Sequence, residues 1–196
     1  MDTAQFLQAR MALCQPEHTV LDVFFQGLLE SITQLTGRPV VMEGSAGPRG
    51  LGARAPSAFR PARDYLQVLH QGALALEATG LTYSDAVETL SATAAGRIFA
   101  APTGEMVLAV AGKDPHQGLS VTQGMAGATS TYGERIYERV SDRSARLIFR
   151  DEFFGPAWSR AMGLAGLRQV NPELQYRSEL ESGEPPYKDF TLLLSW

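Results

Sequence analysis

The residues able to do chemistry are few, and their spacing assembles no catalytic motif. The 196 residues include three histidines and one cysteine. Cys14 and His18 stand four positions apart, as two metal ligands on one helical turn would, but Pro16 breaks that turn and no further ligand accompanies them. His70 and His116 each fall within an expected helix without a second ligand at metal spacing. The sequence therefore predicts no metal, no cofactor and no enzymatic activity.

Arginines are concentrated in one segment, where they alternate with acidic residues. One interpretation is an exposed patch that binds an anion or an acidic partner. The other is a ladder of cross-strand salt bridges on a solvated face, each worth at most ~1 kcal/mol. Because the acids of this segment are nearly as numerous as the arginines, the ladder is favoured. The candidate patch consists of Arg135, Arg139, Arg143 and Arg146.

Composition excludes several classes of protein. The net charge of −4 argues against a nucleic-acid partner, which requires a concentrated positive field. The apolar run at 106–111 is far shorter than the ~20 residues of a membrane-spanning helix, so no membrane insertion is expected. A single cysteine cannot form an internal disulfide, and residues 1–18 lack the apolar stretch of a signal peptide. We therefore expect a cytoplasmic protein.

Helical periodicity dominates the first two-thirds of the chain. Thr19 has the spacing of an N-cap for a helix that runs to Leu35 with a broad apolar stripe, and Gly37 ends it. The segment 43–57 contains four glycines and two prolines, which predicts a flexible loop, either a plain linker or a ligand lid. Further helices are expected over 2–14, 61–78, 84–101, 104–111 and 114–133.

At Gly133 the apolar period changes from about 3.6 to 2, which marks the start of a sheet. Leu147 and Phe149 share one face, and Ile136 and Val140 share another. The expected elements are a hairpin over 134–150, a helix over 156–167, and strands around 173–180 and 186–196. We predict an α+β fold in which the helical part packs on a four-stranded antiparallel sheet of order strand–strand–helix–strand–strand. Residues 1–18 are expected to be an extension of a single domain at 19–196.

Several stretches together resemble a known family. They are TVLDVFFQGLLESI, DYLQVLHQGA, AAGRIFAAPTGEMVLAVAGKDP, STYGERIYERVSDRSARLIFRDEFFGPAW and FTLLLSW. They resemble a myxobacterial domain family of unknown function, restricted to the Myxococcales, and the likeness covers about Val20 to Trp196 outside the insertion at 43–57. That family is distantly similar to a fold group containing the vinyl-reductase domain, the TRAPP vesicle-tethering subunits and the haem-based H-NOX sensors. The resemblance implies helices packed on an antiparallel sheet.

Two departures limit what the resemblance implies about cofactors. H-NOX proteins use a proximal histidine and a Tyr-x-Ser-x-Arg clamp for haem. Here Tyr176 and Ser178 begin that pattern, but Leu180 stands where it requires Arg. Metal-associated vinyl-reductase domains carry a cysteine set in their C-terminal half, where this chain has none. Neither haem nor zinc is therefore expected.

Two functions of different class remain open, both non-catalytic. In the first, a sensing or assembly module holds a small apolar or aromatic ligand between helices and sheet, as the similar vinyl-reductase-like domains do. In the second, the chain is a scaffold that dimerises or binds a protein through the helix at 20–35. The aromatic residues are expected mostly in the core, and some of them would also line a pocket. The candidate pocket residues are Phe24, Leu28, Phe149, Trp158 and Met162.

Overall fold

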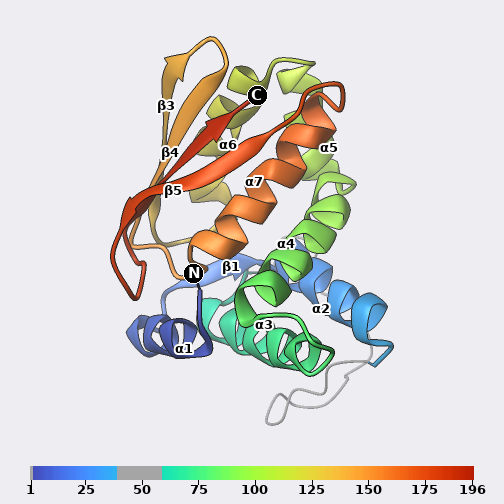
Figure 1. Cartoon of the computed structure of the whole chain (residues 1–196), viewed down its shortest axis with the longest axis vertical. Coiled ribbons are helices and arrows are strands. Elements are labelled where there is room, and N and C mark those ends of the chain that lie inside the picture. Colours follow the sequence, from blue (N-terminus) through green and yellow to red (C-terminus); the bar gives the residue numbers. More distant parts are fainter. Residues whose placement is uncertain (1, 39–58) are drawn as a thin grey trace.

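The computed structural model of the chain describes residues 2–38 and 59–196 (Figure 1), so the expected loop at 43–57 lies outside the described residues. The helices are α1 (Ala4–Leu13), α2 (Asp22–Thr36), α3 (Ala62–Glu77), α4 (Tyr83–Phe99), α5 (Pro102–Ala111), α6 (Pro115–Thr129) and α7 (Pro156–Val170). The strands are β1 (Thr19–Leu21), β2 (Phe59–Pro61), β3 (Glu134–Ser141), β4 (Ser144–Arg150), β5 (Arg177–Gly183) and β6 (Phe190–Ser195). In these ranges, no helix combines the length and apolar character needed to cross a bilayer.

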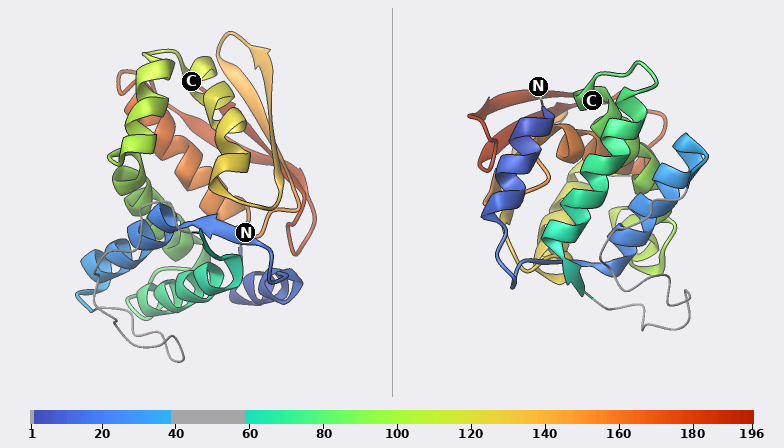
Figure 2. Two further views of the ribbon diagram at one scale, coloured as in Figure 1. Left: turned by 180° about the vertical axis from the view of Figure 1, so that it is seen from behind. Right: turned by 90° about the horizontal axis from the view of Figure 1, so that it is seen from below.

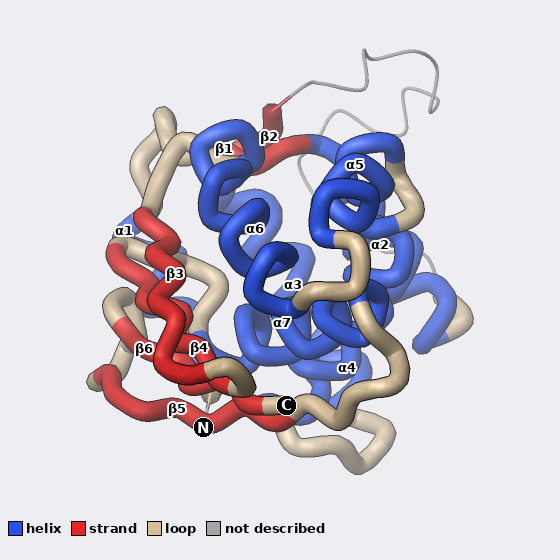
Figure 3. The backbone as a smooth tube through the Cα atoms, turned by 90° about the horizontal axis from the view of Figure 1, so that it is seen from above, coloured by secondary structure: helices blue, strands red, loops and turns tan. Residues whose placement is uncertain are grey.

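The C-terminal third forms the predicted four-stranded antiparallel sheet, in the order β3-β4-β6-β5. Helix α7 stands between β4 and β5 in the chain, so the α+β class and the strand–strand–helix–strand–strand order are both confirmed. Figure 3 shows the strands on one side of the molecule, with α6 and α7 next to them. Alternate residues of the central strands are buried, as a sheet with one covered face requires. They are Ala145, Leu147, Phe149, Phe190, Leu192 and Leu194.

The expected N-cap at Thr19 is wrong, because this residue lies in a strand. Thr19 pairs with Pro61 across β1 and β2, and its backbone N–H donates to the Thr131 hydroxyl at 2.8 Å. Helix α2 begins three residues later, at Asp22, with no side-chain cap. The Thr19 N–H and C=O are used by long-range partners, which the local sequence does not reveal.

The third strand of the sheet begins later than its alternation predicts. The predicted range started at 173, but β5 starts at Arg177. The preceding residues instead form a turn, because the Tyr176 hydroxyl donates to the Asn171 carbonyl at 3.0 Å and the Leu174 N–H also donates to that carbonyl, at 3.4 Å. The hydrogen bond of the Tyr176 hydroxyl thus stabilises a turn where the sequence predicted the start of the strand.

Helix α7 joins two separate hydrophobic cores. It contacts α4 on one side and β5 and β6 on the other, and α6 packs beside both α7 and the β3–β4 hairpin (Figures 1 and 2). One core lies among the helices and includes Leu28, Tyr65, Leu90 and Trp158. The other lies under the sheet and includes Leu119, Leu147, Phe149, Leu167 and Leu192.

Helix α1 is attached to the rest of the fold by a buried arginine. The Arg10 side chain is fully buried and forms an ion pair with Asp2 at 2.9 Å. Its Nε donates to the Phe153 carbonyl and its Nη1 to the Pro186 carbonyl, each at 2.7 Å. Gly155 makes room for it, since a Cβ there would lie 2.6 Å from the guanidinium carbon. Arg10 therefore ties α1 to the turns that precede α7 and β6.

We expect Arg10→Met to lower the free energy of unfolding by about 3–5 kcal/mol, because it leaves the Asp2 carboxylate buried without its charged partner. Urea denaturation followed by circular dichroism measures the loss. The matched control is Arg63→Met, which removes an exposed arginine of α3 and should change stability by no more than about 0.5 kcal/mol. Equal effects of the two substitutions would contradict a structural role for Arg10.

Candidate functional site

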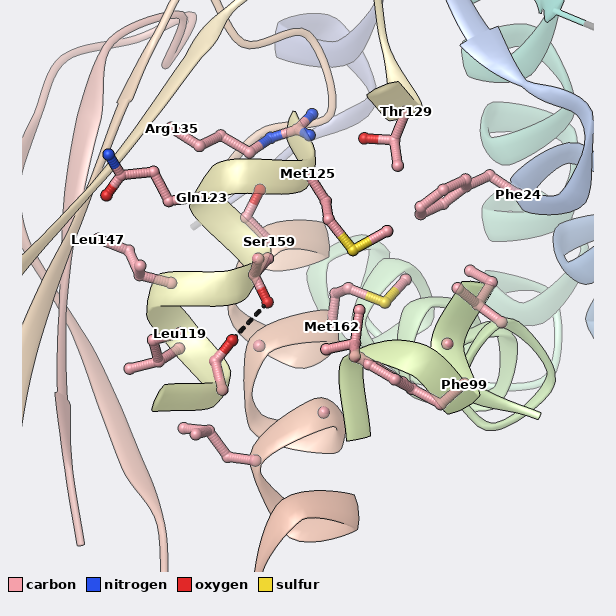
Figure 4. A pocket seen from close by; sticks show the side chains of 18 of the residues that line it. Phe24, Phe99, Leu119, Gln123, Met125, Thr129, Arg135, Leu147, Ser159 and Met162 are labelled. Atoms are coloured by element: carbon pink, nitrogen blue, oxygen red, sulfur yellow. Dashed lines mark hydrogen bonds between the residues drawn. The ribbon is translucent and has the colours of Figure 1, made fainter. Parts of the chain in front are cut away.

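A cavity of about 170 Å³ lies where the helical core and the sheet core meet. Its wall is built by α2, α4, α5, α6, β3, β4 and α7 (Figure 4). Most of the wall is apolar, and the labelled apolar side chains are Phe24, Phe99, Leu119, Met125, Leu147 and Met162. Large ligand pockets span about 300–1,000 Å³, whereas a 150 Å³ apolar cavity holds benzene. The volume of the cavity therefore suits a small molecule of about the size of benzene.

The structure brings four of the five candidate pocket residues to this one cavity. The four residues come from three elements: Phe24 from α2, Phe149 from β4, and Trp158 and Met162 from α7. Leu28 does not line it; this side chain is fully buried in the helical core, one helical turn beyond Phe24. The one-turn spacing put both residues on one face of α2, but only the first reaches the junction of the cores.

Sequence reasoning missed residues from α4, α5 and α6 that complete the wall. Phe99 closes one side, and it fits there because Gly104 and Gly166 carry no side chain. A Cβ at Gly166 would lie 2.7 Å from the Phe99 ring, and one at Gly104 would lie 2.4 Å from the Phe99 backbone. At Gly163 the situation differs, since a Cβ would meet only Leu147, at 4.0 Å. Gly163 therefore leaves open space in the wall.

One end of the cavity carries an ion pair between Arg135, whose side chain is 19% exposed, and Glu152, which is 1% exposed. One carboxylate oxygen of Glu152 accepts the backbone N–H groups of Phe153 and Phe154 at 2.9 and 3.1 Å. The other accepts Nε and Nη2 of Arg135 at 3.1 and 3.0 Å. Burial by itself would lower the pKa of Arg135, but the adjacent Glu152 carboxylate raises that pKa overall. A permanently charged donor therefore lies at the edge of an apolar space.

The four candidate patch arginines do not gather on one surface. The pairing of Arg135 with Phe149 places Arg135 on the covered face of the sheet, whereas Arg146 pairs with Glu138 on the opposite face. Arg146 binds Glu181 of β5 through Nε and Nη2, at 2.7 and 2.8 Å.

The other two candidate arginines lie near the hairpin turn. Arg139 binds Asp142 at 2.7 Å, and Arg143 is an exposed residue of the turn itself. Arg135, Arg139 and Arg146 each pair with an acid, but none of these three pairs joins β3 to β4, and the Arg135 pair belongs to the cavity.

None of the histidines lines the cavity, and neither does the cysteine. His70 binds the Tyr83 hydroxyl at 2.9 Å, and burial lowers the pKa of this imidazole. His116 binds the Tyr137 hydroxyl at 2.8 Å, and His18 accepts a backbone N–H from residue 15. Burial raises the pKa of the Cys14 thiol to about 11, which keeps it protonated at neutral pH. Among residues 2–38 and 59–196, no group of three His, Cys, Asp or Glu side chains could hold a metal ion.

The apolar stripe of α2 is largely used within the chain. Phe25 and Ile32 are each 2% exposed and Leu28 is fully buried, all in the helical core. Phe24, on the flank of the stripe, lines the cavity. The width of the stripe, which suggested a dimer contact, is thus accounted for by two internal surfaces.

Solved structures that align with this chain include H-NOX proteins. An Fe(II) unliganded H-NOX protein from K. algicida aligns with a TM-score of 0.53 and 13% identity, covering 90% of this chain and 95% of that one. An oxygen-binding H-NOX domain related to soluble guanylate cyclases aligns with a TM-score of 0.56 and 11% identity, covering 87% and 92%. At these identities the likeness shows the fold alone. The curated proteins include no match.

The fold group implies haem, but the residues of this chain do not fit it. Proteins hold haem iron by His, Cys, Tyr, or Met together with His. Of these, the cavity wall supplies only the thioethers of Met125 and Met162, and none of the three histidines lines it. Tyr176, which begins the clamp-like pattern, binds a backbone carbonyl outside the cavity. We therefore derive no role for haem.

A protein-family model gives a narrower assignment than the fold does. The match spans residues 13–196, which includes every element that lines the cavity and the Arg135–Glu152 pair. The chain belongs to the family described as "Protein of unknown function (DUF2378)".

Proposed function

We propose that this protein is a non-catalytic binding module, used in sensing or assembly, that holds a small apolar or aromatic ligand in the cavity between its helices and sheet. The observation that carries the proposal is the cavity itself, an apolar space of about 170 Å³ lined by Phe24, Met125 and Met162. Well-packed interiors contain few voids larger than a water molecule. The single cysteine suits a reducing compartment such as the cytoplasm.

The construction of the wall supports a receptor for an apolar molecule. Aromatic rings and thioethers give large, polarisable contact surfaces, and methionine adapts its shape to different partners. In Figure 4 the Met125 and Met162 side chains approach each other across the space, with Phe24 and Phe99 beside them. A ligand there would contact both cores at once, so its binding would be coupled to how the helices pack on the sheet.

Three polar residues of the wall are engaged in hydrogen bonds within the chain, which favours binding over catalysis. An enzyme of this size would need a nucleophile or general base held free to react. Here the Glu152 carboxylate accepts four hydrogen bonds from within the chain. The Thr122 and Thr129 hydroxyls donate to carbonyls of their own helix, at 2.9 and 3.0 Å.

The fold of the H-NOX proteins also supports a sensing role by analogy, since one of them is described as oxygen-binding. In this chain the analogy extends to a ligand cavity between helices and sheet, and it stops before haem chemistry. A sensor built on this cavity would respond through α7, which contacts both α4 and the sheet.

We expect small aromatic compounds such as benzene, toluene and indole to raise the melting temperature of the protein. A ligand at 100 times its Kd adds about 2.7 kcal/mol of stability, or roughly 5–10 °C for a chain of this size. Differential scanning fluorimetry measures the shift, and native mass spectrometry of freshly purified protein reports any ligand already bound. A flat response to the whole panel, with no retained ligand, would refute the proposal.

Substitution of Gly163 by Leu should abolish these ligand-induced shifts, because the new side chain would fill the open part of the wall. The matched control is Gly96→Leu, on the exposed face of α4, where a Cβ meets nothing within 4 Å. Both changes raise helix propensity by about 1 kcal/mol, so a difference between them isolates the cavity. Gly163→Ala, with its smaller volume, should reduce the shifts only in part. Full shifts in Gly163→Leu would contradict binding at this place.

A further inference from the structure

We infer that the ligand of this cavity is an uncharged molecule carrying one hydrogen-bond acceptor, which Arg135 binds; this rests on the proposed function and names the chemical class of its ligand. A carbonyl or ether oxygen on a small apolar or aromatic body has this chemistry. The polar end of the cavity thereby selects among apolar molecules of similar size.

The geometry of Arg135 supplies the donor. Its Nε and Nη2 are both committed to Glu152, whereas Nη1 has no hydrogen-bond partner in residues 2–38 and 59–196. Figure 4 shows the guanidinium group at the end of the cavity where Thr129 and Met125 lie. Since a guanidinium group offers N–H donors and no acceptor, the complementary ligand atom must be an acceptor.

Glu152 makes this donor a fixed one. The Glu152 side chain is 1% exposed, and two backbone N–H groups hold its second oxygen. The carboxylate therefore cannot swing away, and it fixes the plane of the guanidinium group through two hydrogen bonds to one oxygen. The donor is ordered before a ligand arrives, which reduces the entropy lost on binding.

The charge of the pair decides against an ionic ligand. Arg135 and Glu152 together carry no net charge, so an anion would bring an uncompensated negative charge into a buried apolar space next to a carboxylate. A cation would be repelled by the guanidinium charge. Its N–H groups are also donors, so they could not accept a hydrogen bond from Arg135. An uncharged acceptor gains a charge-assisted hydrogen bond from Arg135 without burying an unpaired charge and without repulsion from the guanidinium group.

The test uses three ligands of nearly equal shape: ethylbenzene without an acceptor, acetophenone with an uncharged carbonyl, and benzoate with an anionic carboxylate. Dissociation constants come from isothermal titration calorimetry. A hydrogen bond to a charged group should make acetophenone bind about tenfold or more tightly than ethylbenzene, and benzoate should bind most weakly. The infrared C=O band of bound acetophenone should also move to lower frequency than in hexane.

Variants of the pair assign the effect to Arg135. The double substitution Arg135→Gln with Glu152→Gln removes the cationic donor without leaving a charge unpaired, and it should reduce the preference for acetophenone to less than about threefold. Arg139→Gln, on the same strand but paired with exposed Asp142, should keep the full preference. The ligand order in the unsubstituted protein decides the question even where the double variant does not fold.

The outcomes separate this inference from the function on which it rests. Equal affinity for ethylbenzene and acetophenone would overturn the role of Arg135 and leave the apolar receptor standing. Preferred binding of benzoate would overturn the uncharged-ligand inference, because it would show that the Arg135–Glu152 pair opens for anions. Failure of all three to bind would overturn the cavity as a ligand site, and this inference with it.

Discussion

The structure depends on one buried carboxylate at the point where the chain leaves the sheet. Glu152 lies two residues beyond the end of β4, accepts the next two backbone N–H groups, and pairs with Arg135 of β3. These bonds fix the turn from which α7 starts, and α7 contributes side chains to both hydrophobic cores. Buried carboxylates are costly unless fully hydrogen-bonded. Because both carboxylate oxygens of Glu152 are hydrogen-bonded, the direction in which α7 leaves the turn is fixed. The position of the cavity beside α7 is fixed with it.

The cavity follows from this arrangement of two cores around one helix. The helical core and the sheet core are each closely packed, and the space between them is bounded by small residues of α7 on one side and by α6 on the other. The same fold occurs in H-NOX proteins. In this chain the wall of the cavity presents thioethers and aromatic rings.

The sequence predicted those parts of the fold that local periodicity determines. Alternation at Leu147, Phe149 and Leu192 correctly gave the central strands and their buried face, and the hairpin register confirmed that Ile136 lies on the other face. Where long-range partners decide, prediction failed: Thr19 resembles a helix cap, but bonds to a residue 112 positions away keep it in a strand.

The candidate site was predictable only in part, for a similar reason. Periodicity indicates which aromatic residues face inward, and four of the five nominated residues line the cavity. Periodicity does not indicate at which turn of a helix the two cores meet. The predicted pocket therefore included Leu28, which does not line the cavity, and omitted Phe99, which does. Nor does a row of alternating charges reveal that Arg135 lies at the cavity, since that depends on its pairing with Phe149 and on Glu152 beyond the strand.

The most direct test of the central claim is a crystal structure of the protein under xenon pressure, because xenon enters apolar cavities of about this size without needing a chemical match. The account predicts a strong xenon peak between Met125 and Met162, with the Arg135–Glu152 pair intact. A cavity filled by rearranged side chains, with no xenon between α6 and α7, would contradict it.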